Sequence, residues 1–209
     1  MQYKIQPWQH QLKTIEVCKE REQFALFYEM GTGKTLTTIN ILRQIYKKRK
    51  EILPTIIICP LGVVRNWKKE IEKNAGPAMY ERVQLVRGRT LKQKLKLLED
   101  RSKKIFIINI DSFNSGLWPE IQKKKWDVLV LDESHKCKDS TAKRTQKVIE
   151  ISDRIRYKYL LTGTPILNSP MDIWAQFRIM NSSLFSPNFY AFRAEYFVDK
   201  NAGMPKHKY

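Results

Sequence analysis

The fold of this chain is decided by the stretch Phe24-Ala25-Leu26-Phe27-Tyr28-Glu29-Met30-Gly31-Thr32-Gly33-Lys34-Thr35, in which an apolar run leads into a glycine-rich turn. Apolar residues then recur at helical spacing, at Leu36, Ile39, Leu42 and Ile45. A loop that enters a helix at its N-terminus presents unpaired backbone N–H groups and the positive end of the helix dipole to an anion. The stretch therefore predicts a strand, a phosphate-binding loop and a helix.

The residues of the turn have chemical roles that fit such a loop. Gly31 and Gly33 let the backbone approach phosphate oxygens without a clash from a Cβ atom. Lys34 can reach the β- and γ-phosphates, and Thr35 offers its hydroxyl to Mg²⁺. The full phosphate-loop pattern has another Gly five positions before Gly33, where this chain has Tyr28. A glycine-rich turn that only caps a helix is therefore the alternative.

The second half of a nucleotide site is predicted where the apolar run Val128–Leu131 ends in Asp132-Glu133-Ser134-His135. In phosphate-loop enzymes an acidic residue at the end of a neighbouring strand holds Mg²⁺, and Asp132 has that position. Glu133 would then orient or deprotonate the attacking water. The alternative is a solvated acidic turn. A hydrolase triad of Ser134, His135 and Asp132 is disfavoured, because near-consecutive residues rarely bring three side chains into a relay.

Apolar, β-branched runs alternate with segments of helical periodicity along the chain. Strands without polar alternation are covered on both faces, which is typical of a parallel sheet between two layers of helices. Ligands of such α/β folds bind beyond the carboxyl ends of the strands, so Lys34 and Asp132 are expected to meet at one edge. Strands are predicted over 24–28, 55–59, 82–86, 104–109, 127–131 and 157–161, and helices over 36–45, 64–71 and 91–98.

Helices are also predicted at both ends of the chain. Before the first strand, Trp8, Leu12 and Ile15 fall on one helical face. A later helix is expected to begin near Ser169-Pro170-Met171-Asp172, with Ser169 as its N-cap. Its predicted buried stripe is Ile173, Trp174, Phe177 and Met180, and residues 189–197 are expected to form an aromatic-rich helix.

The composition indicates a folded protein with an anionic partner. The chain has 209 residues, of which 42% are hydrophobic, and a net charge of +18 from 39 Lys and Arg against 21 Asp and Glu. Such an excess of positive charge favours nucleic acid over a membrane surface as the partner. A charge that only solubilises the surface is the alternative.

The cysteines and the apolar runs indicate where the protein is found. Cys18, Cys59 and Cys137 show no metal-ligand spacing and are interpreted as reduced thiols of an intracellular protein, cytoplasmic or nuclear. Residues 1–4 lack the apolar core of a signal peptide. The apolar runs are too short to span a bilayer, so a membrane is not expected among the partners.

Taken in order, these segments resemble the Swi/Snf-type ATPases of helicase superfamily two. The family's phosphate loop also lacks the early Gly, which accounts for Tyr28, and Ser134 stands where the family more commonly has Ala. The resemblance covers residues 5–197. Its blocks are Pro7-Trp8-Gln9, Glu29-Met30-Gly31-Thr32-Gly33-Lys34-Thr35, Cys59-Pro60-Leu61 with Asn66-Trp67-Lys68-Lys69-Glu70, Asp132-Glu133-Ser134-His135, and Leu161-Thr162-Gly163-Thr164-Pro165-Ile166-Leu167-Asn168 with Trp174, Gln176 and Phe177.

The resemblance implies a three-layer RecA-like lobe, a phosphate-loop fold that binds ATP and Mg²⁺. The first block implies that Gln9 recognises adenine, since an amide can bond bidentately to an adenine edge. The family's third motif links the hydrolytic site to nucleic-acid contacts. The implied site residues are Met30, Gly31, Thr32, Gly33, Lys34 and Thr35 for the nucleotide, Thr35 and Asp132 for the metal, Lys34 and Glu133 for catalysis, His135, Thr162, Gly163 and Thr164 for coupling, and Arg65, Asn66, Asp111 and Ser112 for nucleic acid.

The family's motor has two RecA-like lobes, and its second lobe supplies arginines to the transferred phosphoryl group. Residues 1–209 are expected to be a single domain, the first lobe, with the second lobe absent from this chain and supplied in cis or in trans. Arginine fingers contribute on the order of 10³- to 10⁵-fold to turnover in related chemistry, so slow hydrolysis is expected of this lobe alone. The leading hypothesis is the ATP-binding lobe of a double-stranded DNA translocase. A strand-separating RNA or DNA helicase and a non-hydrolysing nucleic-acid-binding adaptor are the alternatives.

Overall fold

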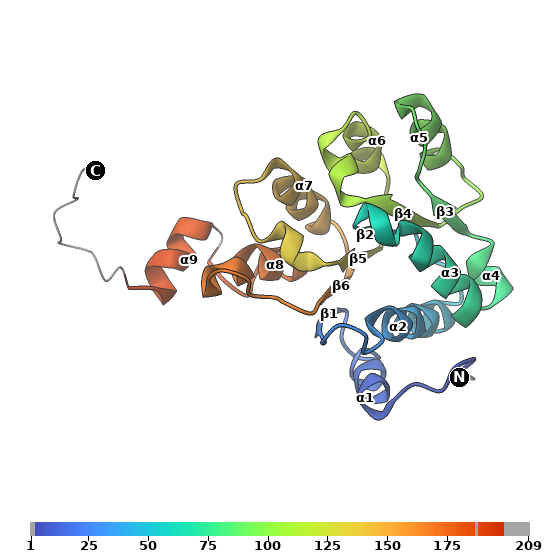
Figure 1. Cartoon of the computed structure of the whole chain (residues 1–209), viewed down its shortest axis with the longest axis horizontal. Helices are drawn as coiled ribbons and strands as arrows, with labels where there is room; N and C mark the ends of the chain where they lie inside the picture. The colour runs from blue at the N-terminus through green and yellow to red at the C-terminus, as the bar shows by residue number, and fades with distance from the viewer. Residues whose placement is uncertain (1–2, 187, 199–209) are drawn as a thin grey trace.

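A sheet of six parallel strands forms the centre of the computed structural model, which describes residues 3–186 and 188–198 (Figure 1). The strand order across the sheet is β1-β6-β5-β2-β4-β3. Every strand lies within one residue of its predicted bounds, so the predicted parallel α/β class is confirmed. The strands are β1 (Gln23–Phe27), β2 (Thr55–Cys59), β3 (Val83–Leu85), β4 (Ile105–Asn109), β5 (Val128–Asp132) and β6 (Tyr157–Thr162).

Helices cover both faces of this sheet, which gives three layers (Figure 1). Alternate residues of one strand enter opposite cores, because side chains of a strand point to the two faces in turn. In β2, Ile57 packs with α1, α2 and α3, whereas Ile56 and Ile58 pack with α5, α6, α7 and α8. The helices are α1 (Gln9–Val17), α2 (Lys34–Arg49), α3 (Val64–Asn74), α4 (Pro77–Tyr80), α5 (Leu91–Leu98), α6 (Trp118–Lys123), α7 (Lys143–Ser152), α8 (Ile173–Met180) and α9 (Phe189–Tyr196).

The strand register brings the ends of β1, β6 and β5 to the same edge of the sheet. Phe27 of β1 pairs with Thr162 of β6, and Leu161 of β6 pairs with Asp132 of β5. β6 therefore lies between the strand that precedes the glycine-rich turn and the strand that ends in the acidic residues. Short 3-10 helices begin at or near the ends of β2, β4 and β5, namely η1 (Leu61–Val63), η2 (Ile110–Asn114) and η3 (Ser134–Cys137). Three strands of the sheet are thus followed by tight turns.

Of Trp8, Leu12 and Ile15, which were predicted to share one helical face, Ile15 is buried in the core but Trp8 is not. Trp8 is the N-cap of α1, outside its first turn, and its side chain is 61% exposed. The buried residues of α1 are Gln11, Thr14 and Ile15. Two polar side chains, Gln11 and Thr14, are thus buried beside Ile15, which apolar periodicity alone does not predict.

The predicted stripe of the helix after residue 169 is also partly wrong. Ser169 does cap this segment, since its hydroxyl accepts a hydrogen bond from the Met171 amide, but the first turn is a 3-10 helix, η4 (Pro170–Asp172). In α8 the fully buried face includes Gln176. Ile173, Phe177 and Met180 are only half-buried, and Trp174 packs with Phe192 of α9. The helix is turned so that a polar side chain reaches the core.

Candidate active site

The glycine-rich turn connects β1 to α2, as the sequence predicted. Gly31 has a φ of +78° and Gly33 a φ of +83°, a left-handed conformation that glycine adopts without a steric cost. A Cβ atom added at Gly33 would lie 2.2 Å from Nε2 of Gln11, whereas one added at Gly31 would meet nothing within 4 Å. The left-handed backbone favours glycine at both positions, and at Gly33 an added Cβ would also displace the side chain of Gln11.

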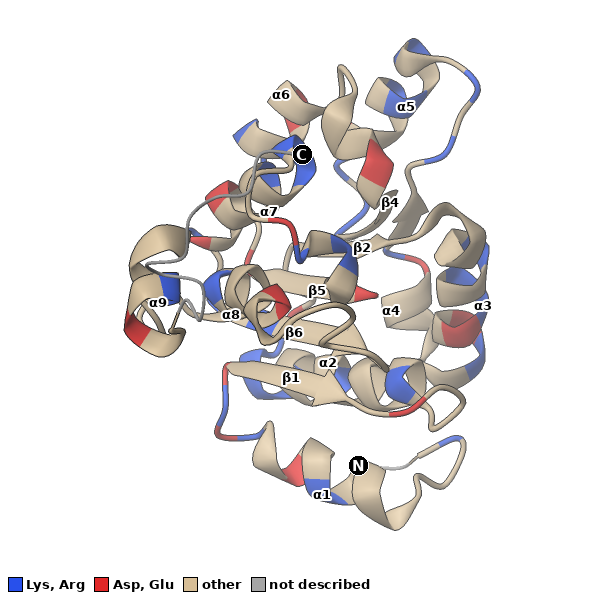
Figure 2. Ribbon diagram, turned by 60° about the vertical axis from the view of Figure 1, so that its left-hand side comes forward, with Lys and Arg blue, Asp and Glu red and all other residues tan. Residues whose placement is uncertain are grey.

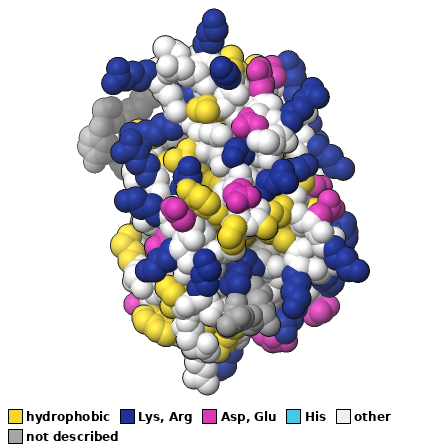
Figure 3. All heavy atoms as spheres, turned by 90° about the vertical axis from the view of Figure 1, so that its right-hand side faces the viewer, with side chains coloured by type: hydrophobic (Ala, Val, Ile, Leu, Met, Phe, Trp, Pro, Cys, Tyr) yellow, Lys and Arg dark blue, Asp and Glu magenta, His cyan; other side chains and the backbone are white. Residues whose placement is uncertain are grey.

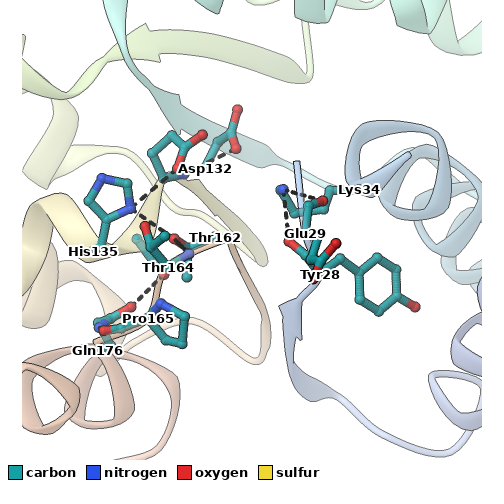
Figure 4. A network of polar contacts seen from close by, with 11 residues as sticks. Tyr28, Glu29, Lys34, Asp132, His135, Thr162, Thr164, Pro165 and Gln176 are labelled. Atoms are coloured by element: carbon teal, nitrogen blue, oxygen red, sulfur yellow. Dashed lines mark hydrogen bonds and ion pairs between the residues drawn. The ribbon is translucent and has the colours of Figure 1, made fainter. Parts of the chain in front are cut away.

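The turn is held by hydrogen bonds to its own carbonyl groups. The ammonium group of Lys34 donates to the carbonyl oxygens of Tyr28 at 3.0 Å and Glu29 at 3.2 Å (Figure 4). The Thr32 hydroxyl donates to the Glu29 carbonyl at 2.7 Å. Thr35 lies in the first turn of α2 with a half-buried side chain. The cation and the hydroxyl predicted to contact phosphate and metal thus lie together at the start of one helix.

The structure places Gln11, a residue that sequence reasoning missed, against this turn. Its Nε2 donates to the Thr32 carbonyl at 2.9 Å, and its Oε1 accepts from the Trp8 amide at 2.8 Å. His10 Nε2 is 3.2 Å from the same Thr32 oxygen. Gln9, the residue expected to recognise adenine, is exposed at the start of α1. The sequence did hold a signal for the contact between Gln11 and the Trp8 amide. Gln11 is the third residue of α1, the position where a Gln side chain completes a capping box.

Asp132 is the last residue of β5, and both of its carboxylate oxygens accept hydrogen bonds. Oδ2 accepts from the indole Nε1 of Trp67 at 2.8 Å, and Oδ1 accepts from the Glu133 amide at 3.0 Å. Burial raises the pKa of Asp132, while the bond from Trp67 and the charge of Lys34 act in the opposite direction. The strand register brings the ends of β1 and β5 to one edge, so the two predicted halves of the site lie at the same edge of the sheet.

Glu133 combines backbone strain with a carboxylate oxygen that lacks a hydrogen bond. Its φ of +52° is left-handed, which is uncommon for a residue other than glycine and is concentrated at functional sites. Within the described residues, its buried Oε2 has no hydrogen-bond partner, although His135 Nδ1 lies 3.3 Å away. An unpaired, buried carboxylate oxygen fits a group that takes a proton from water.

The predicted coupling residues lie at the end of β6, beside the acidic residues; Figure 4 shows His135, Thr162 and Thr164 in one network, apart from the contacts of Lys34. His135 Nδ1 is 2.8 Å from the Thr162 hydroxyl, which also accepts from the Thr164 amide at 3.1 Å. Burial lowers the pKa of His135, which favours the neutral imidazole. A Cβ atom added at Gly163 would lie 3.3 Å from the Tyr28 carbonyl oxygen, so the segment packs directly against the turn.

A second buried contact, also missed by sequence reasoning, ties the acidic residues to α8. The Ser134 hydroxyl donates to Oε1 of Gln176 at 2.7 Å, and both residues are fully buried. Gln176 Nε2 in turn donates to the carbonyl oxygens of Pro165 at 2.7 Å and Asp172 at 3.1 Å. Ser134 and Gln176 thus form a polar contact inside the core. The signal was the Ser134 hydroxyl itself, which needs a partner once it is buried.

The four residues predicted to contact nucleic acid differ in accessibility. Arg65 and Asn66 are exposed in the first turn of α3. Asp111 is exposed and lies 3.7 Å from Arg144, whereas Ser112 is only 5% exposed and presents little surface to a partner. Lys and Arg residues occur on many helices and loops rather than in one patch (Figure 2; Figure 3).

The residues present fit Mg²⁺ bound together with a nucleotide better than a metal held by protein alone. No cluster of three or more His, Cys, Asp or Glu residues suited to a metal occurs in the part of the chain that the structure describes. Mg²⁺ is usually bound by one or two carboxylates together with substrate phosphates. Asp132 and Thr35 would supply such a partial set, since each Asp132 oxygen keeps a lone pair beyond its hydrogen bond.

Comparison of the sequence with known proteins shows the family of this chain. The family model of the SNF2-related domain matches residues 10–207. The DNA repair and recombination protein RAD54B of Homo sapiens is 34% identical over 165 residues, which are 75% of this chain and 17% of the relative. The ATP-dependent helicase brm of Drosophila melanogaster is 31% identical over 160 residues, 75% of this chain and 9% of the relative.

A solved structure shows the same architecture. The SWI2/SNF2 ATPase core of Sulfolobus solfataricus in complex with double-stranded DNA superposes with a TM-score of 0.75 at 27% identity. The match covers 92% of this chain and 39% of that core, so the chain spans well under half of the core and a smaller share of the relatives above. Among the described helices, none combines the length and apolar character needed to cross a bilayer.

These matches confirm the RecA-like fold and the resemblance to Swi/Snf-type ATPases that the ordered sequence blocks indicated. The family model extends over the glycine-rich turn, the acidic residues and the coupling segment alike. The chain therefore belongs to the SNF2-related domain family.

Proposed function

We propose that residues 1–209 form one domain, the ATP-binding lobe of an ATP hydrolase that moves along double-stranded DNA. The observation that carries the proposal is the convergence of Lys34, Asp132 and Glu133 at one edge of the sheet. These residues come from two chain segments separated by strand β6, and the register of β1, β6 and β5 brings the ends of these strands to the same edge. A cation, a metal-binding carboxylate and a base are the groups that phosphoryl transfer requires.

The roles of the side chains follow from their contacts. Lys34 would exchange its bonds to two loop carbonyls for bonds to the phosphates of ATP, while Asp132 and Thr35 hold the metal. Bound Mg²⁺ would supply charge neutralisation on the phosphate oxygens. Glu133 would accept a proton from the attacking water through its unpaired Oε2. His135, kept neutral by burial, would position this carboxylate from 3.3 Å away.

Double-stranded DNA is the partner that the relatives favour. The solved core with which this chain superposes was bound to double-stranded DNA. The exposed side chains of Arg65 and Asn66 on α3 offer contacts to phosphates, which carry no sequence preference. Binding should weaken with salt by about 0.9 log units per log unit of salt for each phosphate neutralised. An interaction that is nearly independent of salt would contradict this part of the proposal.

A second lobe is needed for fast turnover under this proposal. The match to 39% of the solved core leaves room for a further lobe that supplies arginines, in the same chain or in a partner. Duplex DNA should then stimulate ATP hydrolysis by the complete motor more than single strands do, whereas a strand-separating helicase would show no such preference.

An intracellular location, cytoplasmic or nuclear, is proposed because all three cysteines are buried and free.

The proposal is tested by measuring the affinity for Mg-ATP and the slow rate of ATP hydrolysis in site variants, each compared with a control variant. Lys34→Ala should abolish most of the affinity for Mg-ATP, whereas Lys92→Ala, which removes an exposed lysine of α5, should not. Glu133→Gln should keep the affinity and reduce hydrolysis by about 10²- to 10⁴-fold, since that is the contribution of a general base. Glu81→Gln removes an exposed carboxylate and serves as its control. Equal affinity in Lys34→Ala and the unchanged chain would refute the proposal. Hydrolysis that Glu133→Gln leaves unchanged would contradict the role of Glu133 as the base, and ATP binding without detectable hydrolysis in either chain would favour an adaptor.

A further inference from the structure

One buried side chain, Trp67, links the exposed start of α3 to the carboxylate of Asp132. Successive residues of a helix point about 100° apart, so neighbours in sequence can face solvent and core. Arg65 and Asn66 are exposed, whereas Trp67 is 1% exposed and is among the largest fully buried side chains. The first turn of α3 therefore has two side chains at the surface and one that reaches Asp132.

Trp67 donates its indole N–H to a carboxylate, that of Asp132. An indole has one donor and no acceptor, so its bond fixes the ring in one orientation. Trp67 gives that donor to Oδ2 of Asp132 at 2.8 Å, across 65 positions of sequence. Trp126, a comparably buried residue, donates instead to a backbone carbonyl, that of Ile121, at 2.9 Å. A buried indole N–H needs an acceptor, and in Trp67 that acceptor is the carboxylate of Asp132 rather than a backbone carbonyl.

We propose that Trp67 is a positioning residue for Asp132, and that it ties the position of α3 to the metal-binding carboxylate. The proposal rests on the function given above, in which Asp132 holds Mg²⁺ together with ATP. With Oδ2 bonded to Trp67 and Oδ1 to the Glu133 amide, the carboxylate has one orientation, and its free lone pairs have fixed directions.

The physical reason for coupling is the steep dependence of a hydrogen bond on geometry. A bond of 2.8 Å weakens quickly when the donor moves or tilts. A nucleic acid that contacts Arg65 and Asn66 and shifts α3 would move the Trp67 indole with it. The orientation of Asp132 would then depend on whether the surface of α3 is occupied. This connection is separate from the one through His135 and Thr162.

The test compares Trp67→Phe with Trp126→Phe in the full chain. Each variant keeps an aromatic ring and removes one buried indole N–H bond, so general loss of packing is matched. Affinity for ATP is measured with and without magnesium chloride. Trp67→Phe should weaken binding by about 10- to 100-fold in magnesium, as the loss of partners that orient metal ligands does. Affinity without magnesium should not change, and Trp126→Phe should change neither value.

A double substitution and a spectroscopic signal distinguish positioning from a structural role. In an Asp132→Asn background, adding Trp67→Phe should cause no further loss of magnesium-dependent affinity, because the group it positions is gone. Mg-ATP should also change the tryptophan fluorescence of the unchanged chain and of Trp126→Phe. That change should be absent from Trp67→Phe, since the indole bonded to the metal-binding carboxylate reports the binding.

The outcomes separate this inference from the proposed function. If the unchanged chain shows no magnesium-dependent ATP affinity, the proposed function fails, and the role of Trp67 fails with it. If the unchanged chain shows that dependence and Trp67→Phe keeps it, the inference alone is overturned. Equal losses with and without magnesium, or additive losses with Asp132→Asn, would also overturn it, because they indicate a purely structural role.

Discussion

Replacing Gly33 by Ala tests the close packing of α1 against the phosphate loop. Gly31 and Gly33 both have left-handed backbone conformations, with φ of +78° and +83°. An alanine in that conformation costs about 1–2 kcal/mol, so Gly31→Ala should reduce the free energy of unfolding by this amount. Nothing lies within 4 Å of a Cβ atom at Gly31, so no further cost is expected there.

At Gly33 the added methyl group also meets a side chain. Its Cβ would lie 2.2 Å from Nε2 of Gln11, the atom that donates to the Thr32 carbonyl. Gln11 can swing aside, but it then loses that hydrogen bond, which contributes about 0.5–1.5 kcal/mol. Gly33→Ala should therefore destabilise the chain by about 1.5–3.5 kcal/mol in total. The difference between the two variants corresponds to about 1–6 °C in Tm for a domain of this size.

The assay is urea unfolding of both variants, together with Gly62→Ala as a control. Gly62 has no positive φ and nothing within 4 Å of its added Cβ, so that variant should be neutral or more stable by about 0.4–1 kcal/mol. In a Gln11→Ala background the extra loss at Gly33 should vanish, because the side chain that the methyl group meets is gone. Equal losses at Gly31 and Gly33 in the unchanged background would refute the reasoning.

Two further predictions follow from buried polar contacts. Ser134→Ala and Gln176→Leu each leave a buried partner without its hydrogen bond. In the double variant, the loss in unfolding free energy should therefore be smaller than the sum of the two single losses by about 0.5–3 kcal/mol. Strictly additive losses would contradict the contact. For His135, the folded-state pKa lies below the ordinary value of 6.5 because of burial. The unfolded chain therefore binds the proton more readily, and the free energy of unfolding should fall as pH decreases through and below 6.5. His135→Gln should show a shallower decrease in the same unfolding titration, and an unchanged slope would count against a buried, neutral imidazole.

The local parts of the fold could be predicted because their signals are local. The apolar runs predicted all six strands within one residue, since a strand buried on both faces needs continuous apolar sequence. The glycine-rich sequence predicted a turn between β1 and α2, and the structure adds that Gly31 and Gly33 have left-handed backbone there. Parallel pairing then brought Lys34 and Asp132 to one edge, because the ends of parallel strands coincide. Periodicity failed at Trp8 and in α8, where a cap and a buried amide override the apolar pattern.

The sequence by itself determined the order of the strands along the chain, the phosphate loop and the two acidic side chains, because each depends on residues next to one another. Only the tertiary structure decided that Gln11 rather than Gln9 lies against the loop, and that Trp67 donates to Asp132. Those contacts join residues 21 and 65 positions apart. A hydrogen bond across such a separation depends on how helices pack on the sheet, and helix periodicity shows only which residues share a face.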